Sequence, residues 1–537
     1  MKRISFAKIH FGILLWLSGS FSAFAQLTSS NLPIVVINTE VQIPDEPKVL
    51  GKMGIIWNGD GNENKITDAY NHYDGLVGIE IRGQSSQSFD KKSYGIELWD
   101  EDQDGIDFGL LGFPEEEDFV FHGPFSDKSL MRNALAYYLA SKNMEYAPRI
   151  KFFELVLNDE YMGVYLLTER IKRDKYRVDI KKLDPEDISG DKLTGGYILK
   201  FDKGLQEEIA WESPILPFPG AGKTRVMFDT PDYDEMVPEQ FNYIKGYIDE
   251  FETVLNGSEF KDPAFGYAKY IDVKSFIDFS LVNELSRNVD GYRLSSFFYK
   301  DRESEGGKIK AGPVWDFNLA FGNANYCNGS NIDGWAWDFN SVCPDDYWVI
   351  HFWWTKLLED PAYISKMRDR WIELRKDSFS DEKIMFAIDS MQSEIGEAGI
   401  RNFEKWDVLG EYVWPNNFVG ETYQEEMTYL KTWVQDRLNW MDYQFDVVLA
   451  LEPEQETGIR IYPNPSSGIF FVQSEEAWKG GERMIIYSPL GQEIQEVTFA
   501  EGQKKTRFDI LAGNGIYIYQ IIEPNGRVIL RGKLTLN

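Results

Sequence analysis

The sequence feature that most constrains the fold is a change in hydrophobic period near the middle of the chain. Up to about residue 205, short apolar runs bounded by polar turns are typical of β-strands. The runs predicted as strands are Pro33–Asn38, Gly78–Arg82, Tyr94–Leu98, Lys151–Leu157, Met162–Leu167 and Gly196–Lys200. From about Glu239 the period becomes helical, with Phe241, Ile244, Ile248 and Phe251 on one helix face. This segregation predicts an α+β fold, with a β-rich part (30–205) and a helical part (235–450).

Each part also contains elements of the other kind. A helix is predicted over Ser129–Lys142, after Ser126 and Asp127 as a plausible N-cap, and a strand over Ser296–Tyr299. The helical part is expected to include Phe276–Leu285, Ser365–Arg375 and Glu425–Trp440.

A separate unit is predicted at the end of the chain. The acidic, turn-rich stretch 451–458 has the composition of a linker. Beyond it, residues 459–537 contain about six short strands with Gly and Asn turns, which is typical of a small β-sandwich.

The first 25 residues are typical of a secretory signal peptide. Lys2, Arg3 and Lys8 precede an apolar stretch, and small residues ending in Ala23-Phe-Ala25 follow it. The apolar stretch is too short to favour the alternative of a membrane anchor. We therefore expect an exported protein that has no transmembrane segment after cleavage behind Ala25.

Charge and cysteine content fit an extracytoplasmic protein. The formal net charge is -31, which disfavours nucleic acid as a partner. The two cysteines, Cys327 and Cys343, are expected to form one disulfide in an oxidising compartment, the alternative being two free thiols. The sequence contains no C-x-x-C, H-E-x-x-H or G-x-S-x-G motif, which weakens zinc-site, zinc-protease and α/β-hydrolase interpretations.

Two carboxylates mark the densest group of chemically capable residues. Asp290 follows a predicted helix, and Asp316 follows a predicted strand with Asn318 two residues on. Phosphoryl transfer uses one carboxylate toward the acceptor hydroxyl and another to hold Mg²⁺ on the phosphates. Asp316 and Asn318 offer oxygen ligands to such a cation. From spacing alone, a turn cap for Asp290 and an arginine partner for Asp316 are the simpler interpretation.

Several motifs in order resemble the CotH family of atypical protein kinases, which are related to a spore-coat kinase. The motifs are Ile79-Glu-Ile-Arg-Gly-Gln-Ser-Ser86, Lys91-Lys-Ser-Tyr94, Asp127-Lys-Ser-Leu-Met-Arg-Asn133, Gly163-Val-Tyr-Leu-Leu-Thr-Glu-Arg170, Gly195-Gly-Tyr-Ile-Leu-Lys200, Asn288-Val-Asp-Gly-Tyr292 and Val314-Trp-Asp-Phe-Asn-Leu-Ala-Phe-Gly322. The resemblance covers roughly residues 32–448. It implies a two-lobed kinase-like domain that uses ATP and Mg²⁺ (or Mn²⁺) to phosphorylate Ser or Thr of secreted or surface proteins.

The resemblance also implies roles for single residues. Asp290 is the expected catalytic aspartate, and Asp316 and Asn318 are the expected metal ligands. The family often has W-D-x-D where this chain has Asn318, a neutral ligand that should bind metal more weakly.

Lys92 is expected to reach phosphate and to be held by Glu169, as in the lysine–glutamate pair of ordinary kinases. Arg82 and Arg132 are further phosphate candidates. Surface ion pairs are the competing interpretation for each of these residues.

The last unit looks like the type A sorting domain of the type IX secretion system. The motifs are Ile461-Tyr-Pro-Asn-Pro-Ser-Ser-Gly468, Tyr487-Ser-Pro-Leu-Gly491 and Gly515-Ile-Tyr-Ile-Tyr519. This resemblance implies the type IX machinery as a partner, a Gram-negative host of the Bacteroidetes type, and export through the periplasm to the cell surface or medium.

A second class of function remains open at this point. Trp335, Trp337, Trp348, Trp353 and Trp354 offer an aromatic surface for sugars, although aromatic residues beside a disulfide more often belong to the core. The alternative is therefore a surface adhesion or carbohydrate-binding protein on a kinase-like fold that no longer transfers phosphate.

Overall fold

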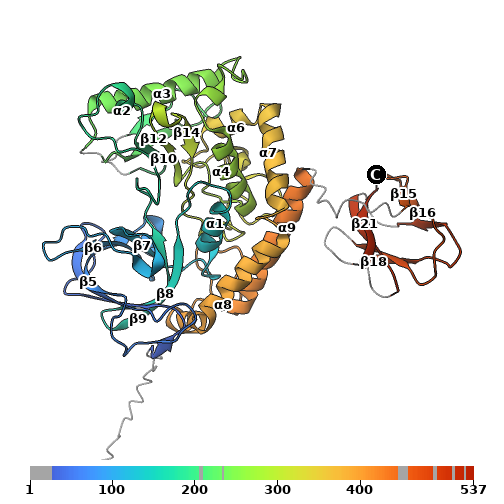
Figure 1. Ribbon diagram of the computed structural model, residues 1–537, viewed down its shortest axis with the longest axis horizontal. Helices are drawn as coiled ribbons and strands as arrows, with labels where there is room; N and C mark the ends of the chain where they lie inside the picture. Colours follow the sequence, from blue (N-terminus) through green and yellow to red (C-terminus); the bar gives the residue numbers. More distant parts are fainter. Residues whose placement is uncertain are drawn as a thin grey trace, which may run out of the picture.

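The computed structural model describes residues 27–204, 210–232, 235–445, 458–487, 493–510, 515–524 and 528–536. The predicted signal peptide (1–25) and positions 451–457 of the predicted linker lie outside the described residues. The predicted mixed α+β organisation is confirmed, with a β-rich first part, a largely helical middle and strands at the end (Figure 1).

The first part closes into a β-barrel in the order β2-β3-β5-β6-β7-β9-β8. Closure depends on β2 and β8, which pair in parallel, whereas the other neighbours in the barrel are antiparallel. Alternate apolar residues of these strands point inward and fill the barrel. The strands are β2 (Ile34–Thr39), β3 (Val49–Ile56), β5 (Tyr73–Arg82), β6 (Ser93–Trp99), β7 (Asp118–His122), β8 (Ile150–Leu157) and β9 (Glu160–Glu169), and the short strands β1 (Ser29–Ser30) and β4 (Asn64–Lys65) pair beside them.

A second sheet follows the barrel. The sequence pattern did not predict that its strands form one sheet. Its order is β11-β12-β10-β13-β14, built from β10 (Tyr197–Phe201), β11 (Ala210–Glu212), β12 (Arg225–Thr230), β13 (Ser296–Lys300) and β14 (Ile309–Ala311). One face of this sheet packs into the main helical core through alternate residues such as Leu199 and Phe298. The opposite face carries Ile198 and Phe297, which pack with Ile171 from the segment that follows β9.

The helices surround this second sheet and one side of the barrel (Figure 1). Helix α8 packs against β9 of the barrel, and α4 packs against α1, α7 and α9. The helices are α1 (Arg132–Ala140), α2 (Gly190–Leu193), α3 (Pro238–Asn256), α4 (Val273–Ser286), α5 (Phe339–Val342), α6 (Phe352–Leu357), α7 (Pro361–Arg375), α8 (Asp381–Lys405) and α9 (Tyr423–Gln444). Helix α1 is shorter than predicted, and the Asp127 carboxylate accepts the backbone N–H of Arg132 in its first turn.

The last unit consists of two sheets with one shared core. The sheets have the orders β15-β16-β19 and β18-β17-β20-β21. Phe470 and Val472 of one sheet pack with Met484, Ile486 and Leu534 of the other, which is the arrangement of a β-sandwich. The strands are β15 (Ile459–Tyr462), β16 (Ile469–Ser474), β17 (Arg483–Tyr487), β18 (Glu493–Thr498), β19 (Lys505–Asp509), β20 (Gly515–Ile522) and β21 (Val528–Leu536).

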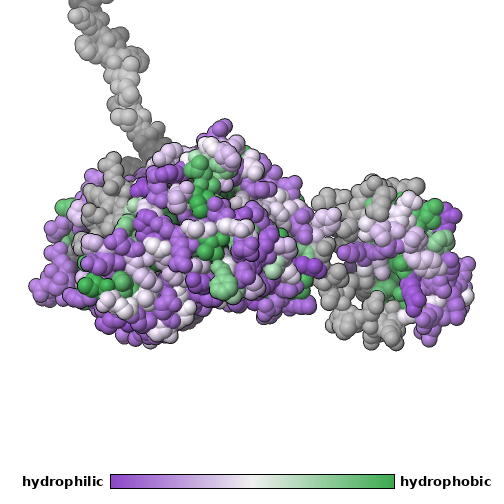
Figure 2. All heavy atoms as spheres, turned by 90° about the horizontal axis from the view of Figure 1, so that it is seen from above, coloured by the Kyte–Doolittle hydropathy of each residue, from purple (hydrophilic) through white to green (hydrophobic). Residues whose placement is uncertain are grey.

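Two further expectations concern the cysteines and the membrane. The predicted disulfide is confirmed, since Cys327 and Cys343 are joined with their Cα atoms 5.6 Å apart. Among the helices of the described ranges, none combines the length and apolar character that a bilayer crossing requires. Figure 2 shows a face on which hydrophilic residues predominate and apolar residues gather in small groups.

Candidate functional site

The candidate site lies where the barrel meets the second sheet. Strand β5 ends at Arg82, and Asp202 and Lys203 follow the end of β10. Asp290 follows α4, and Asp316 follows β14. These residues are close enough that the charges of Arg82, Asp202, Lys203 and Asp290 all act on the Asp316 carboxyl. The structure thus brings Asp290, Asp316 and Arg82 close together, and it places Asp202 and Lys203 beside them.

Backbone strain is concentrated in the same region. Non-glycine residues with positive φ are uncommon, and they collect where surrounding structure enforces a function-related conformation. Seven of the twelve such residues in the described ranges fall between 287 and 328: Arg287, Tyr292, Ser295, Asp316, Phe321, Cys327 and Asn328. Both candidate carboxylates therefore lie in the most strained stretch of the described chain.

Helix α1 holds the loop that carries Asp316. Asn133 and Tyr137 are four residues apart and so lie on one helix face. The Asn133 Oδ1 accepts the Phe317 N–H at 2.6 Å, and the Tyr137 hydroxyl accepts the Asp316 N–H at 3.2 Å. Asp316 has a φ of 61°, in the left-handed region, which these two hydrogen bonds maintain. The backbone of Asp316 is thus fixed while its carboxylate is left for another partner.

The Asp316 carboxylate has no direct ion-pair partner among the described residues. Within the described ranges it receives no hydrogen bond or ion pair, so the simpler interpretation, an arginine partner, is wrong. Burial first, and then the negative charges of Asp290 and Asp202, raise the pKa of Asp316 to about 7. Arg82 and Lys203 oppose this shift without cancelling it. A divalent cation bound by oxygen ligands would relieve this excess negative charge, so the residues present fit a Mg²⁺ or Mn²⁺ site.

A pH dependence of stability follows from the raised pKa of Asp316. The folded protein keeps the proton up to about pH 7, whereas the unfolded chain loses it near the ordinary pKa of 3.8. Metal-free protein therefore loses stability as pH rises from about 4 to 7, and the Asp316→Asn variant lacks this loss. We expect the variant to be more stable than wild type above pH 7 by on the order of 2 kcal/mol, since one pKa unit corresponds to about 1.4 kcal/mol and solvent screens part of the effect. Thermal melting in EDTA at pH 5 and pH 8 measures this, and an equal difference between the two proteins at both pH values would contradict it.

Asp290 is held in a turn after α4. Its backbone N–H donates to the Asn288 Oδ1 at 3.2 Å, and its carboxylate accepts Nη2 of Arg293 at 2.8 Å. The side chain of Asp290 is 16% exposed, so one side of it faces solvent. The turn is held in place by the fully buried Glu284, which accepts the Tyr292 hydroxyl at 2.9 Å.

Arg82 is a well-placed candidate for an anionic ligand. Its guanidinium lies 5.5 Å from the centre of the Trp315 ring, beside Asp316. Within the described ranges it forms no hydrogen bond or ion pair, so its donors are available to a phosphate. Lys203, which donates to Ser85 Oγ at 3.0 Å, lies across from the loop that follows Arg82. Its place directly after the Gly195-Gly-Tyr-Ile-Leu-Lys200 motif was the signal that could have identified it.

The expected pairing of Lys92 with Glu169 is wrong. Lys92 Nζ donates to the backbone carbonyls of Gln87 and Phe89 at 2.7 and 2.5 Å, so it stabilises the loop before β6. Glu169 instead accepts Arg149 Nη1 at 2.7 Å and the Tyr146 hydroxyl at 3.2 Å.

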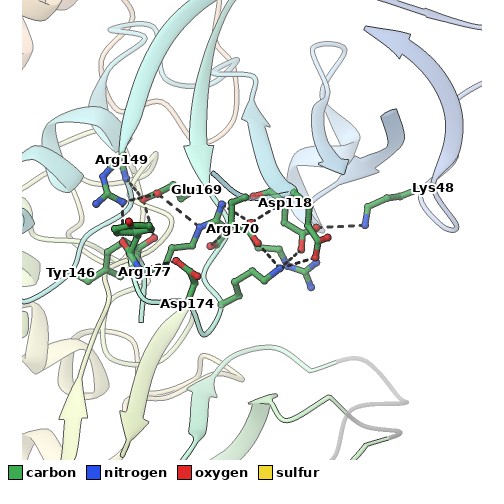
Figure 3. Close-up of polar contacts among 12 residues, drawn as sticks. Lys48, Asp118, Tyr146, Arg149, Glu169, Arg170, Asp174 and Arg177 are labelled. Atoms are coloured by element: carbon green, nitrogen blue, oxygen red, sulfur yellow. Dashed lines mark hydrogen bonds and ion pairs between the residues drawn. The ribbon is translucent and has the colours of Figure 1, made fainter. Parts of the chain in front are cut away.

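Figure 3 shows Glu169 facing Arg149, Tyr146 and Arg177, whereas the next residue, Arg170, is directed toward Asp118. Successive residues at a strand end point to opposite faces, and Arg170 is the one that reaches the charges around the site. Its positive charge acts on Arg82 and on Asp229 of β12. Glu169 therefore pairs with Arg149 away from Lys92, whereas the charge of Arg170 acts on Arg82.

Arg132 is a structural residue and not an exposed phosphate ligand. Its side chain is 1% exposed, and Nη1 lies 2.6 Å from Oδ1 of the equally buried Asp127. Nη2 is directed at the Phe321 carbonyl at 3.5 Å. The pair joins the start of α1 to the end of the Asp316 loop.

Loss of this buried pair should affect folding and not ligand affinity. Arg132→Met leaves the Asp127 carboxylate buried without its cation, which typically costs about 3–5 kcal/mol. We expect a lower melting temperature and an unchanged dissociation constant for nucleotide below that temperature. A variant of normal stability with weakened nucleotide binding would restore the original phosphate-ligand interpretation.

Two other groups of residues do not form competing sites. Glu116, Glu117 and Asp118 lie within metal-ligating distance of one another, but Lys172 pairs with all three and Arg177 pairs with Glu116. The five tryptophans do not form one exposed platform, because Trp353 and Trp354 are buried. Trp335 and Trp337 stack on each other and pack against the main core.

Two family profiles match the chain. The family profile described as CotH kinase protein matches residues 79–441, which contain every site residue named above. The profile described as Secretion system C-terminal sorting domain matches residues 460–532. No curated protein matches the chain. The sorting domain directs the protein through type IX secretion to the cell surface or the medium. Because the CotH kinase profile matches more than half of the length of the chain, the chain belongs to the CotH family.

Proposed function

We propose that this protein is a secreted or surface-attached kinase that transfers phosphate from ATP to Ser or Thr of extracytoplasmic proteins. The observation that carries the proposal is the uncompensated Asp316 carboxylate beside Asp290, with the Arg82 guanidinium next to it. A site for Mg²⁺ and nucleotide phosphates needs an anionic group for the metal and cationic donors for the phosphates, side by side.

Each residue then has a distinct role. Asp316 would hold Mg²⁺ or Mn²⁺, which when bound supplies positive charge to the phosphates. Arg82 and Lys203 would bind phosphate oxygens from the opposite side. Asp290 would accept the proton of the acceptor hydroxyl and orient that hydroxyl. The barrel would form one lobe of a two-lobed kinase-like domain, and the second sheet with its helices the other.

Calorimetry of mature protein with the non-hydrolysable analogue AMP-PNP tests this proposal. We expect binding in the presence of Mg²⁺ or Mn²⁺ and loss of binding in EDTA. The Asp345→Asn variant is a matched control, because it removes an exposed carboxylate from the segment after α5 without touching the proposed ligands. Absence of binding with either metal would remove the kinase proposal, and glycan binding without nucleotide binding would favour the adhesion alternative.

Asn318 offers a gain-of-function prediction. Its backbone carbonyl accepts Asn323 Nδ2 at 2.8 Å, and within the described ranges its side chain forms no hydrogen bond. Asn318→Asp adds a charged oxygen ligand beside Asp316, so the metal concentration required for half-maximal nucleotide binding should fall, by about 10-fold. A metal titration at fixed AMP-PNP measures this. An unchanged or higher metal requirement would show that residue 318 is not a ligand.

A further inference from the structure

Arg293 is the buried cation that contacts the candidate catalytic carboxylate. Its side chain is 3% exposed, and Nη2 lies 2.8 Å from Oδ1 of Asp290. Nε donates to the Val289 carbonyl at 3.0 Å, within the same turn. The remaining donors are directed away from the turn, so Arg293 links Asp290 to another part of the chain.

That other part is the segment around Cys343, at one end of the loop 327–343 that the disulfide closes. Nη1 of Arg293 donates to the Trp348 carbonyl at 3.0 Å and to Asp346 Oδ1 at 3.3 Å. The guanidinium carbon lies 4.1 Å from the centre of the Phe339 ring in α5. Within the described ranges, the hydrogen bonds, ion pair and ring contact that the Arg293 guanidinium makes outside its own turn thus come from residues 339–348, on both sides of Cys343.

The disulfide is connected to these contacts through backbone and side-chain hydrogen bonds. The Cys343 carbonyl accepts the Asp346 N–H at 3.2 Å, and Asp346 Oδ1 in turn accepts the Trp348 N–H at 2.9 Å. Cys343 is tied to Cys327, at the other end of the closed loop. No Lys or Arg occurs between Lys310 and Lys356, so this segment offers acceptors and carboxylates to Arg293 and brings no competing cation. A chain of direct contacts therefore runs from the disulfide through Asp346 to Arg293 and Asp290.

We infer that Arg293 is a positioning residue for Asp290, and that the Cys327–Cys343 disulfide holds Arg293 in place, so that the protein becomes fully active only after oxidation. This inference rests on the proposed function. The cytoplasm keeps thiols reduced, whereas disulfides form in the periplasm and outside the cell. The geometry therefore restricts phosphate transfer to the compartments into which sorting delivers the protein. Formation of the disulfide passes two electrons and two protons from the Cys327 and Cys343 thiols to a disulfide-bearing oxidant outside the cytoplasm, which is reduced to a dithiol. In the reverse direction, dithiothreitol gives two electrons and two protons to the Cys327–Cys343 disulfide and is itself oxidised to its cyclic disulfide.

The first experiment separates positioning from stability. Arg293→Ala should lower kcat about 10²-fold, since misplacement of a reacting group by about 1 Å has an effect of this size, while the dissociation constant of Mg²⁺ and AMP-PNP stays within about twofold. Arg293→Lys should recover part of kcat, because lysine keeps the charge but lacks the planar fork whose separate nitrogens contact Asp290 and the Trp348 carbonyl.

Arg287→Ala is the matched control. Arg287 also anchors the closed loop, by donating to the Asn328 carbonyl, but it does not touch Asp290. This variant should melt at a lower temperature and keep its kcat. Equal losses of kcat in Arg287→Ala and Arg293→Ala would overturn the inference. Asp346→Asn replaces Arg293→Ala if the latter does not fold, and it should lower kcat in the same direction.

The second experiment tests the link to the disulfide. Both cysteines are partly exposed, so dithiothreitol can reach them. Reduction should lower the kcat of wild type several-fold but cause no further loss in Arg293→Ala, because the same contact is already missing. Full activity of reduced wild type, or an equal relative loss in both proteins, would overturn the inference.

Hydrogen exchange distinguishes failure of this inference from failure of the proposed function. Reduction should speed amide exchange across residues 288–294 whether or not the protein transfers phosphate. Unchanged exchange there after reduction would overturn the coupling even in an inactive protein. Oxidised wild type that transfers no phosphate would instead count against the kinase proposal.

Discussion

Asp316→Asn is expected to abolish Mg²⁺-dependent nucleotide binding, with a loss of affinity of more than about 100-fold. Outer-shell partners of metal ligands are already worth about 10- to 100-fold, so loss of the charged ligand itself should cost more. Asparagine keeps the shape of the side chain, so the hydrogen bonds from the Asp316 and Phe317 amides to α1 should remain. Calorimetry with AMP-PNP at several Mg²⁺ concentrations measures the effect.

The melting temperature of the same variant serves as the control for misfolding. Because Asp316 is destabilising as a carboxylate above pH 7, the metal-free variant should melt higher than wild type at pH 8. Weak binding together with a lower melting temperature would point to damage to the fold. Retained Mg²⁺-dependent binding would show that Asp316 does not hold the metal.

Asp290→Asn should have a different effect, in which binding survives and transfer does not. We expect phosphate transfer to fall by about 10²- to 10⁴-fold, the range typical of a lost general base. Affinity for Mg²⁺ and AMP-PNP should change little, because Asp290 acts on the acceptor side. The amide of the variant can still accept a hydrogen bond from Arg293, which limits disturbance of the turn, and Asp290→Ala provides the full deletion.

Kinetics and calorimetry on the same preparations decide this prediction. A fall in kcat with an unchanged dissociation constant identifies a group that acts in the transition state. Loss of nucleotide binding in Asp290→Asn equal to that in Asp316→Asn would instead mean that both carboxylates hold the metal.

The sequence predicted the kinds of elements better than it predicted their assembly. The change from a strand period to a helix period correctly separated the β-rich part from the helical middle. Closure of the barrel depends on parallel pairing of Ile34–Ile37 with Glu154–Leu157, strands that are far apart in sequence. Hydrophobic alternation shows which face of a strand is buried, but it does not show which strands become neighbours. The second sheet was not predicted for the same reason, since β10 and β13 were both predicted as strands but their pairing with each other was not.

Some residues of the candidate site could be predicted from the sequence and others could not, because a motif does not contain the packing of distant strands. Asp290 and Asp316 lie on short motifs that resemble a family, and the structure brings both together with Arg82. The pairing of Lys92 with Glu169 required the mutual orientation of two strand ends, which a motif does not contain. Both side chains found nearer partners, as backbone carbonyls for Lys92 and as Arg149 for Glu169.

Arg132 shows a further limit of sequence reasoning. An arginine in a polar motif looks the same whether it faces a ligand or a buried carboxylate. The decisive fact is that Asp127, five residues earlier, turns back onto the start of α1 and pairs with it. Asp202 and Lys203 follow the end of β10, and the assembly of the second sheet, which a motif does not contain, places them beside Asp316.

Phosphate transfer by the purified mature protein is the most direct test of the central claim. Oxidised wild type is incubated with γ-labelled ATP and a mixture of Ser- and Thr-containing protein acceptors, with Mg²⁺, with Mn²⁺ or with EDTA. The account predicts labelled phosphoserine or phosphothreonine with a metal present, none in EDTA, and none above background for Asp316→Asn. Labelling that persists in EDTA or in Asp316→Asn, or no labelling of any acceptor with either metal, would contradict it.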